Sequence, residues 1–142
     1  MIEKIEITID VIVHATEDIE KIFLAFEEIL ELDKDDFNIS KTTGHFDNPI
    51  IILNTKIVKK QAQNLITKIL DNLSKEQINQ MIDEIEERTI DSRFHIRFGK
   101  QEMVKGELVF VEKDPIKIKI HTPVYNKKET VKIFTKIFQK SN

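Results

Sequence analysis

The sequence of 142 residues contains no cysteine and no tryptophan, and it has only three glycines and three prolines. The absence of cysteine excludes disulfides, iron–sulfur clusters, cysteine zinc sites and thiol catalysis. Scarce glycine and proline also exclude collagen-like and low-complexity segments. No apolar run approaches the roughly 20 residues of a membrane-spanning helix, and the N-terminus leads directly into a strand-like pattern without a signal peptide. We therefore expect a soluble, cytoplasmic protein with one domain over residues 1–142.

Charges of opposite sign gather in the two ends of the chain. The formal net charge is −3, but residues 1–48 carry 13 acidic and 4 basic side chains, whereas residues 92–142 carry 12 basic and 5 acidic ones. The net charge of a whole chain averages over faces that need not meet the same partner. The C-terminal part is therefore basic enough to attract an anionic partner.

Periodic patterns predict six strands and four helices. Strands are expected over residues 5–14, 37–43, 50–58, 93–98, 107–112 and 116–121. Helices are expected over residues 17–32, 59–73, 75–85 and 127–138. We expect Thr16 to cap the first helix, and Ser74 with Gln77 to form a capping box for the third. The order βαββααβββα, with several strands that lack crossover helices, predicts an α+β domain with a mostly antiparallel sheet and helices on one face.

If the apolar positions of each strand face the helices, the other positions form an open face of the sheet. The strands expected at 50–58, 93–98 and 116–121 then contribute Asn54, Lys56, Arg93, His95, Arg97, Lys117, Lys119 and His121. Further basic residues follow strand ends or lie in the loop after residue 98, namely Lys59, Lys60, Lys100 and Lys105. Such a patch suits phosphate oxygens, because each neutralised phosphate releases counterions. The alternative is a solvated face, since lysine is common on natural sheets.

The aromatic residues argue against one mode of nucleic-acid binding. Phe94, Phe98, Phe134 and Phe138 fall on predicted core positions, and Phe46 lies in a loop. The open face therefore lacks the stacked aromatics with which some sheets hold single-stranded bases. Any RNA contact would read shape and backbone, or use loops.

The sequence contains no enzymatic or cofactor motif. Its histidines are scattered without the HxxxH or HExxH spacing of metal sites, and it has no GxSxG and no glycine-rich phosphate loop. His95 and His121 share the predicted open face, and their role in binding a metal stays open. Asp10 and His14 share one side of the first strand and suggest a metal-dependent phosphodiesterase only loosely. We expect no catalysis, no cofactor and no metal.

Three stretches together resemble a known family. They are His14-Ala15-Thr16-Glu17-Asp18, Thr43-Gly44-His45-Phe46-Asp47-Asn48-Pro49-Ile50, and Arg97-Phe98-Gly99-Lys100-Gln101 followed by Gly106-Glu107-Leu108. The chain resembles archaeal RNA-binding proteins described as predicted exosome subunits, whose fold is similar to the ribosomal protein of the large subunit that binds 5S rRNA. The chain departs from the family pattern at Phe46-Asp47, where a small or glycine-containing pair is expected.

The resemblance implies roles for the residues of these motifs. The family-motif positions are His14, Thr16, Glu17, Asp18, Gly44, His45, Asn48, Pro49 and Gly106. We expect Gly44 to supply a positive φ and Pro49 to set an extended backbone. His45 and Asn48 suit base edges or 2′-hydroxyls, and they equally suit the satisfaction of turn backbone. Arg97, Lys100 and Gln101 form the most function-like cluster, and a solvated hairpin end is the alternative.

Two hypotheses from different classes follow. The first is a non-catalytic RNA-binding protein that acts in RNA processing, in association with the exosome, or in ribosome-related metabolism. Its partners are RNA, single-stranded or structured, and exosome or ribosome-related proteins. The expected RNA contacts are Lys56, Lys59, Lys60, Arg93, Arg97, Lys100, Gln101, Lys105, Lys117 and Lys119. The second is a protein-interaction or homodimerisation module that uses the open sheet face.

Overall fold

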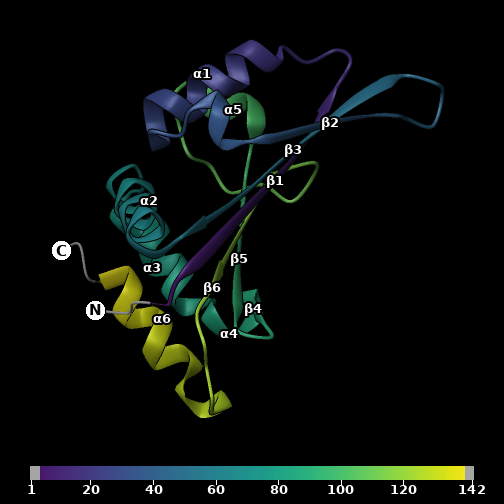
Figure 1. The fold of residues 1–142 in the computed structure, drawn as a ribbon. Coiled ribbons are helices and arrows are strands. Elements are labelled where there is room, and N and C mark those ends of the chain that lie inside the picture. Colours follow the sequence, from purple (N-terminus) through teal and green to yellow (C-terminus); the bar gives the residue numbers. More distant parts are fainter. Residues whose placement is uncertain (1–3, 140–142) are drawn as a thin grey trace.

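The computed structural model describes residues 4–139, which form a six-stranded antiparallel sheet with helices on one face (Figure 1). The strands lie in the order β2-β3-β1-β6-β5-β4. Their bounds are β1 Glu6–His14, β2 Asn38–Thr43, β3 Pro49–Val58, β4 Thr89–Ile90, β5 Arg93–Phe98 and β6 Ile116–His121. The first strand of the sequence therefore lies in the middle of the sheet, between β3 and β6.

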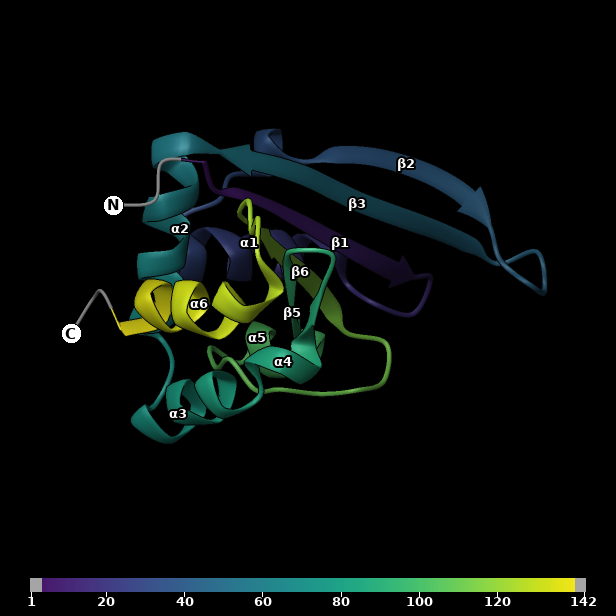
Figure 2. The same cartoon turned by 90° about the horizontal axis from the view of Figure 1, so that it is seen from below.

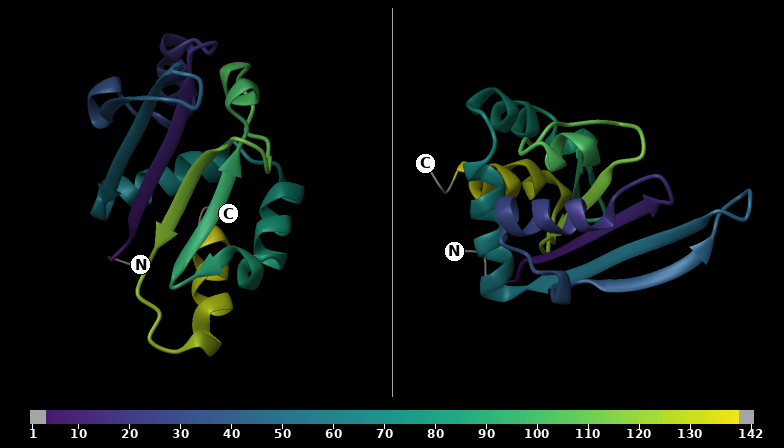
Figure 3. Two further views of the ribbon diagram at one scale, coloured as in Figure 1. Left: turned by 90° about the vertical axis from the view of Figure 1, so that its right-hand side faces the viewer. Right: turned by 90° about the horizontal axis from the view of Figure 1, so that it is seen from above.

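Six helices and two short 3-10 turns are the other regular elements of residues 4–139. They are α1 Ile19–Leu30, η1 Lys34–Asp36, α2 Lys59–Asp71, α3 Lys75–Asp83, α4 Ile85–Arg88, α5 Lys100–Val104, η2 Lys127–Glu129 and α6 Thr130–Gln139. Helices α1, α2, α3 and α6 lie on one side of the sheet, and the opposite side is open (Figures 1 and 3). Within residues 4–139, no helix is both long and apolar enough to cross a membrane.

The core lies between the sheet and the helices. Every second residue of β1, β5 and β6 is buried there, as the alternating pattern predicts. Phe94 of β5 packs against Phe134 and Phe138 of α6, with ring centroids 5.7 and 4.8 Å apart. Burying such side chains stabilises the fold by roughly 2–3 kcal/mol each. It also directs the polar residues of the same strands to the open face.

The predicted α+β class, the antiparallel sheet and the position of the helices on one face are confirmed. The predicted order lacks α4 and β4, which come before β5, and it is wrong again after β5. Residues 107–112 form no strand, but only an isolated bridge between Phe110 and Phe98, at the end of β5 that lies beyond its short pairing with β4. Residues 100–104, expected as a loop, form helix α5.

The structure also corrects the start of α1. The N-cap is Asp18, not Thr16, and its Oδ1 accepts hydrogen bonds from the backbone N–H groups of Glu20 and Lys21 at 3.0 and 3.4 Å. The capping box predicted for α3 is confirmed, since Ser74 and Gln77 exchange two hydrogen bonds of 2.8 and 3.1 Å.

Candidate nucleic-acid interface

Strands β5 and β6 lie side by side in the sheet (Figure 3, left), and the side chains of both strands that are not buried in the core are basic. Their register places Arg93 opposite His121, His95 opposite Lys119, and Arg97 opposite Lys117. The residues that alternate with them are buried in the core. We call the set Arg93, His95, Arg97, Lys117, Lys119 and His121 the basic band.

The cations of the basic band are close enough to affect one another. The pKa of His95 lies below its usual value, chiefly because the imidazole is partly buried and also because Lys119, Arg97, Arg93 and Lys117 surround it with positive charge. Among residues 4–139, no carboxylate forms an ion pair with the two arginines or the two lysines of the band. The band is therefore free to bind an anion.

Strand β1 separates the basic band from Lys56. It contributes two carboxylates to the open face, because Glu6 lies opposite His121 and Asp10 lies opposite Lys117. Glu6 Oε2 is 3.7 Å from Lys56 Nζ and 4.0 Å from His121 Nδ1, and Asp10 accepts a hydrogen bond of 2.9 Å from the Asn54 amide. The sequence pattern did not predict this interruption, because it does not reveal which strands are neighbours.

Three other predicted RNA contacts lie apart from the basic band. Lys59 and Lys60 begin α2 directly after β3, on the far side of β1 from β6. Lys105 ends α5, which packs beside α1. All three side chains are exposed, so they are accessible to a ligand, but they do not extend the patch on β5 and β6.

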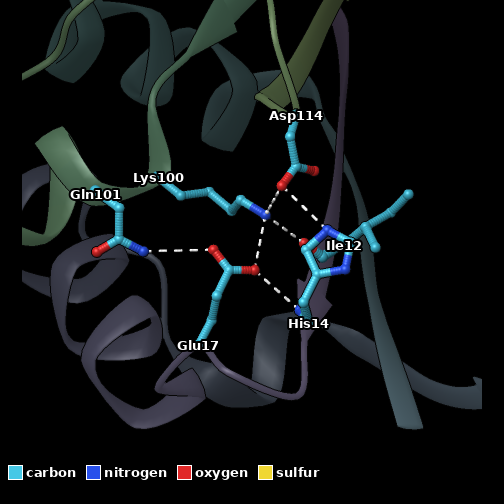
Figure 4. A network of polar contacts seen from close by, with 6 residues as sticks. All are labelled: Ile12, His14, Glu17, Lys100, Gln101 and Asp114. Atoms are coloured by element: carbon cyan, nitrogen blue, oxygen red, sulfur yellow. Dashed lines mark hydrogen bonds and ion pairs between the residues drawn. The ribbon is translucent and has the colours of Figure 1, made fainter. Parts of the chain in front are cut away.

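Lys100 is buried, which differs from its predicted place in an exposed loop (Figure 4). Its side chain is only 3% exposed. The ammonium Nζ donates hydrogen bonds to the carbonyl oxygen of Ile12 at 2.7 Å, to Glu17 Oε1 at 2.9 Å and to Asp114 Oδ2 at 2.9 Å. An ammonium has three protons, so these acceptors use its full donor capacity. We therefore withdraw Lys100 from the set of expected phosphate contacts.

The same cluster joins two of the three stretches that carry the family resemblance. Glu17 Oε1 also accepts a hydrogen bond from the backbone N–H of His14 at 2.9 Å, and its Oε2 accepts one from the Gln101 amide at 3.4 Å. His14 Nε2 lies 3.0 Å from Asp114 Oδ2. We call Ile12, His14, Glu17, Lys100, Gln101 and Asp114 the Lys100 network (Figure 4).

Opposing effects act on the Asp114 carboxyl. Its partial burial alone would raise its pKa, but the hydrogen bonds and charges of Lys100 and His14 outweigh burial and lower the pKa below the usual value. The lowered pKa favours the ionised form of Asp114 beside the buried Lys100 ammonium. The arrangement tethers the residues after β1 to α5 and to the loop before β6.

The network has the spacing of a metal site but not its charge balance. Ligand atoms of His14, Glu17 and Asp114 lie within 4.8 Å of one another. However, the Lys100 ammonium already stands between the two carboxylates and supplies the positive charge that a metal ion would supply. Among the described residues no group of metal-ligand spacing includes His95 or His121. The loose pairing of Asp10 with His14 is also not found, since Asp10 contacts Asn54 and His14 contacts Asp114.

The turn between β2 and β3 contains the remaining family stretch. Gly44 N–H donates to the carbonyl of Asn48 at 2.7 Å, and Asp47 N–H donates to the carbonyl of Gly44 at 3.2 Å. The prediction that Gly44 has a positive φ is wrong: Asp47 has it, with φ 59°. A Cβ at Gly44 would lie 2.6 Å from Ile50 Cδ1, the flexible end of a side chain that can shift.

The remaining family-motif positions lie at the ends of elements or on the surface. Pro49 begins β3, opposite Thr43. Gly106 follows α5 with φ 95°, a conformation that favours glycine. Thr16, His45 and Asn48 are exposed, and the His45 ring meets the Phe46 ring edge-on at 5.1 Å between centroids.

An antiparallel sheet with helices on one face and, on the other, a cationic band without phenylalanine, tyrosine or tryptophan defines an α+β domain suited to a polyanion. Residues 6–122 match the model of a family described as RNA binding, and the chain belongs to this family. Sequence and fold thus converge on one class of protein.

Archaeal proteins are similar to this chain over most of its length. The RNA-binding protein PAB1135 of Pyrococcus abyssi is 36% identical over 136 residues, which cover 88% of this chain and 86% of that protein. The uncharacterized protein MJ0213 of Methanocaldococcus jannaschii is 36% identical over 137 residues, with 89% and 91% covered. The crystal structure of AF2318 from Archaeoglobus fulgidus, a DUF54 protein, has a TM-score of 0.77 at 26% identity and covers 96% of this chain and 99% of its own.

Proposed function

We propose that this protein binds RNA without catalysis, and that the basic band is its principal contact with the phosphate backbone. The observation that carries the proposal is the juxtaposition of Arg93, Arg97, Lys117 and Lys119 on two paired strands, without carboxylate partners among the described residues. Arginine forks and lysine ammonium groups bind phosphate oxygens and release the counterions held there. Membership of the RNA-binding family supports RNA as the polyanion.

The proposed ligand is structured RNA, whose shape and backbone the band would follow. Single-stranded RNA is usually held on a sheet by aromatic side chains that stack with bases. The positions of β5 and β6 that face outward are Arg93, His95, Arg97, Lys117, Lys119 and His121, none of which offers a phenyl or indole platform. The phenylalanines of β5 point to the core.

The proposed cellular role is RNA processing, in association with the exosome, or ribosome-related metabolism in the cytoplasm. The name of the Pyrococcus abyssi relative supports RNA binding. The resemblance of the three sequence stretches supports the wider role and the likeness to the ribosomal protein that binds 5S rRNA. Co-purification of the protein with exosome subunits or with 5S rRNA from an archaeal cell extract tests the two settings separately.

Charge reversal within the band tests the proposal. The variant Arg97→Glu with Lys119→Glu should bind a structured RNA about tenfold or more weakly in fluorescence anisotropy, because it places two anions beside the phosphates. The matched control is Lys132→Glu with Lys136→Glu, which makes the same change of charge on exposed positions of α6, behind the sheet. Equal affinities of the two variants would contradict the role of the band.

A protein-interaction or homodimerisation module is the second candidate. The observation that favours it is an apolar area on the open face, where Ile12 is 43% exposed and lies opposite Ile52 of β3. Strand β2 also forms one edge of the sheet, and all six of its residues are exposed. A dimer in light scattering that Ile12→Lys converts to monomer would support this function, and a monomer at all concentrations would contradict homodimerisation.

A further inference from the structure

Phe46 stands apart from the other phenylalanines of the chain. All nine lie within the described residues, and Phe46 alone is exposed, with 79% of its surface accessible. It lies in the turn of the β2–β3 hairpin, which extends beyond the rest of the sheet (Figures 1 and 2). A side chain that is usually buried for its large apolar surface is therefore presented to solvent at the end of the molecule.

The turn that holds Phe46 is well defined by hydrogen bonds. Two backbone hydrogen bonds close the turn that contains Phe46. The N–H of Gly44 donates to the carbonyl of Asn48, and the N–H of Asp47 donates to the carbonyl of Gly44. The positive φ of Asp47 is a conformation that a side chain adopts at some energetic cost, so the local contacts must enforce it. The rings of His45 and Phe46 form a T-shaped pair, and 79% of the Phe46 surface is still accessible to another partner.

The groups around Phe46 suit a nucleobase better than a phosphate. Asp47 adds a negative charge to the turn, and this charge repels the RNA backbone. Its carboxylate accepts hydrogen bonds from amino groups on base edges, and the Asn48 amide can donate and accept. Phenyl rings stack on bases of any sequence. We propose that the hairpin tip, defined as residues 44–48, is a second RNA contact that stacks an unpaired base on Phe46.

This inference rests on the proposed function, and the geometry of the sheet lets one RNA reach both places. Asn54 lies beside Asp10, which in turn lies opposite Lys117 of the basic band. From Asn54 the chain runs back along β3 and the turn to Phe46, eight residues away, a path of at most about 26 Å at roughly 3.3 Å per residue. An RNA stem on the band can therefore present a loop or bulge at the tip, within a single bound molecule.

The test uses a stem-loop RNA with 2-aminopurine in its unpaired loop, and a blunt duplex with the same stem. We compare the full-length protein with Phe46→Ala, Phe46→Leu and Phe46→Tyr. Leucine keeps the apolar surface without an aromatic face, and tyrosine keeps the face. Leu24→Ala is the matched control, because Leu24 is another exposed apolar residue (52%), on helix α1.

The expected result is specific to the unpaired base. Phe46→Ala and Phe46→Leu should weaken stem-loop binding about tenfold and change duplex binding less than about twofold, and they should abolish the change of 2-aminopurine fluorescence on binding. Phe46→Tyr should restore both signals, and Leu24→Ala should behave as the unmodified protein.

Failure of this inference is distinguishable from failure of the proposed function. If Phe46→Ala binds the stem-loop as tightly as the unmodified protein while Arg97→Glu with Lys119→Glu weakens it, the tip contact is wrong and the band stands. If Phe46→Leu binds like the unmodified protein, stacking is wrong. If the unmodified protein binds neither RNA at low salt, RNA binding itself is wrong.

Discussion

Lys100 links β1, the start of α1 and the loop before β6 beyond the point where the pairing of β1 with β6 ends. The last pair of β1 with β6 is Asp10 with Lys117, so the carbonyl of Ile12 lies beyond the ladder and needs another donor. The buried ammonium of Lys100 satisfies it and at the same time neutralises Glu17 and Asp114. An unpaired polar group in such a place would be costly. The role of Lys100 is therefore stability of the β1–α1 junction, and the family resemblance at these residues reflects structure.

Replacing Lys100 should destabilise the protein strongly. We expect Lys100→Met to lower the free energy of unfolding by about 3 kcal/mol, because it leaves the Ile12 carbonyl and the largely buried Glu17 carboxylate without their donor. Urea denaturation followed by circular dichroism measures the change. Lys113→Met, an exposed lysine of the neighbouring loop, is the control and should change stability by less than about 0.5 kcal/mol. Equal stability of the two variants would contradict the structural role of the network.

The pKa of His95 depends on the charges of the basic band around it. In the free protein its pKa is held below 6.5, first by burial and then by the surrounding cations. Phosphates bound to these cations would offset their positive charge and so raise the pKa of His95. RNA binding would then take up a proton, so affinity should rise as pH falls through the interval between the pKa values of the free and the bound protein.

The pKa of His95 is measured by NMR titration of its imidazole in the free protein and with RNA. Lys119→Met should raise the pKa in the free protein, since it removes the cation with the largest effect. A pKa that stays the same when RNA binds would show that phosphate does not approach this part of the sheet.

At the scale of elements, the start of α1 shows how a local signal can be misplaced. Thr16, Glu17 and Asp18 all suit a helix N-terminus, and sequence alone favoured the first of them. In the structure Glu17 bonds Lys100 and the backbone of His14, and the cap therefore falls on Asp18.

The two candidate caps can be separated by mutation. Asp18→Ala should destabilise the protein by about 1 kcal/mol, because the N–H groups of Glu20 and Lys21 lose their acceptor. Thr16→Ala is the internal control and should have little effect. The urea midpoints of the two variants in the same buffer measure their stabilities. A larger loss of stability in Thr16→Ala than in Asp18→Ala would contradict the assignment of Asp18 as the cap.

Elements with a clear period were predictable, and short ones were not. The alternation in β1, β5 and β6 and the apolar stripes of α1, α2 and α6 reflect burial on one side only, which sequence records directly. Helix α5 has five residues and β4 has two, too few to display a period. The segment 107–112 has strand-forming residues, but it meets β5 only through the bridge of Phe110 with Phe98.

At the scale of the whole molecule, the order of strands decides the shape of the candidate site. The sequence predicted which residues face outward, and the structure agrees for β5, β6 and the even-numbered residues of β1. It could not predict that β1 lies between β3 and β6, since strand pairing depends on contacts far apart in the chain. As a result Glu6 and Asp10 divide the open face, and the cations gather on β5 and β6 instead of spreading across the sheet.

The separation of charge explains how an acidic chain can bind an anion. The excess of acidic residues belongs to β1, α1, η1 and the turns beside them, whereas the cations of the basic band lie on β5 and β6. Physiological salt limits the range of electrostatic interactions between exposed charges to about 8 Å. A bound RNA therefore interacts with the nearby cations of the basic band more than with the net charge of −3.

The dependence of RNA affinity on salt tests the central claim most directly. Fluorescence anisotropy at several salt concentrations gives the slope of log affinity against log salt, at about 0.7 to 0.9 per neutralised phosphate. Four band cations predict a slope of about −3 for structured RNA, and Arg97→Glu with Lys119→Glu should reduce its magnitude by about half or more. A slope near zero, or one unchanged by this variant, would contradict RNA binding through the basic band.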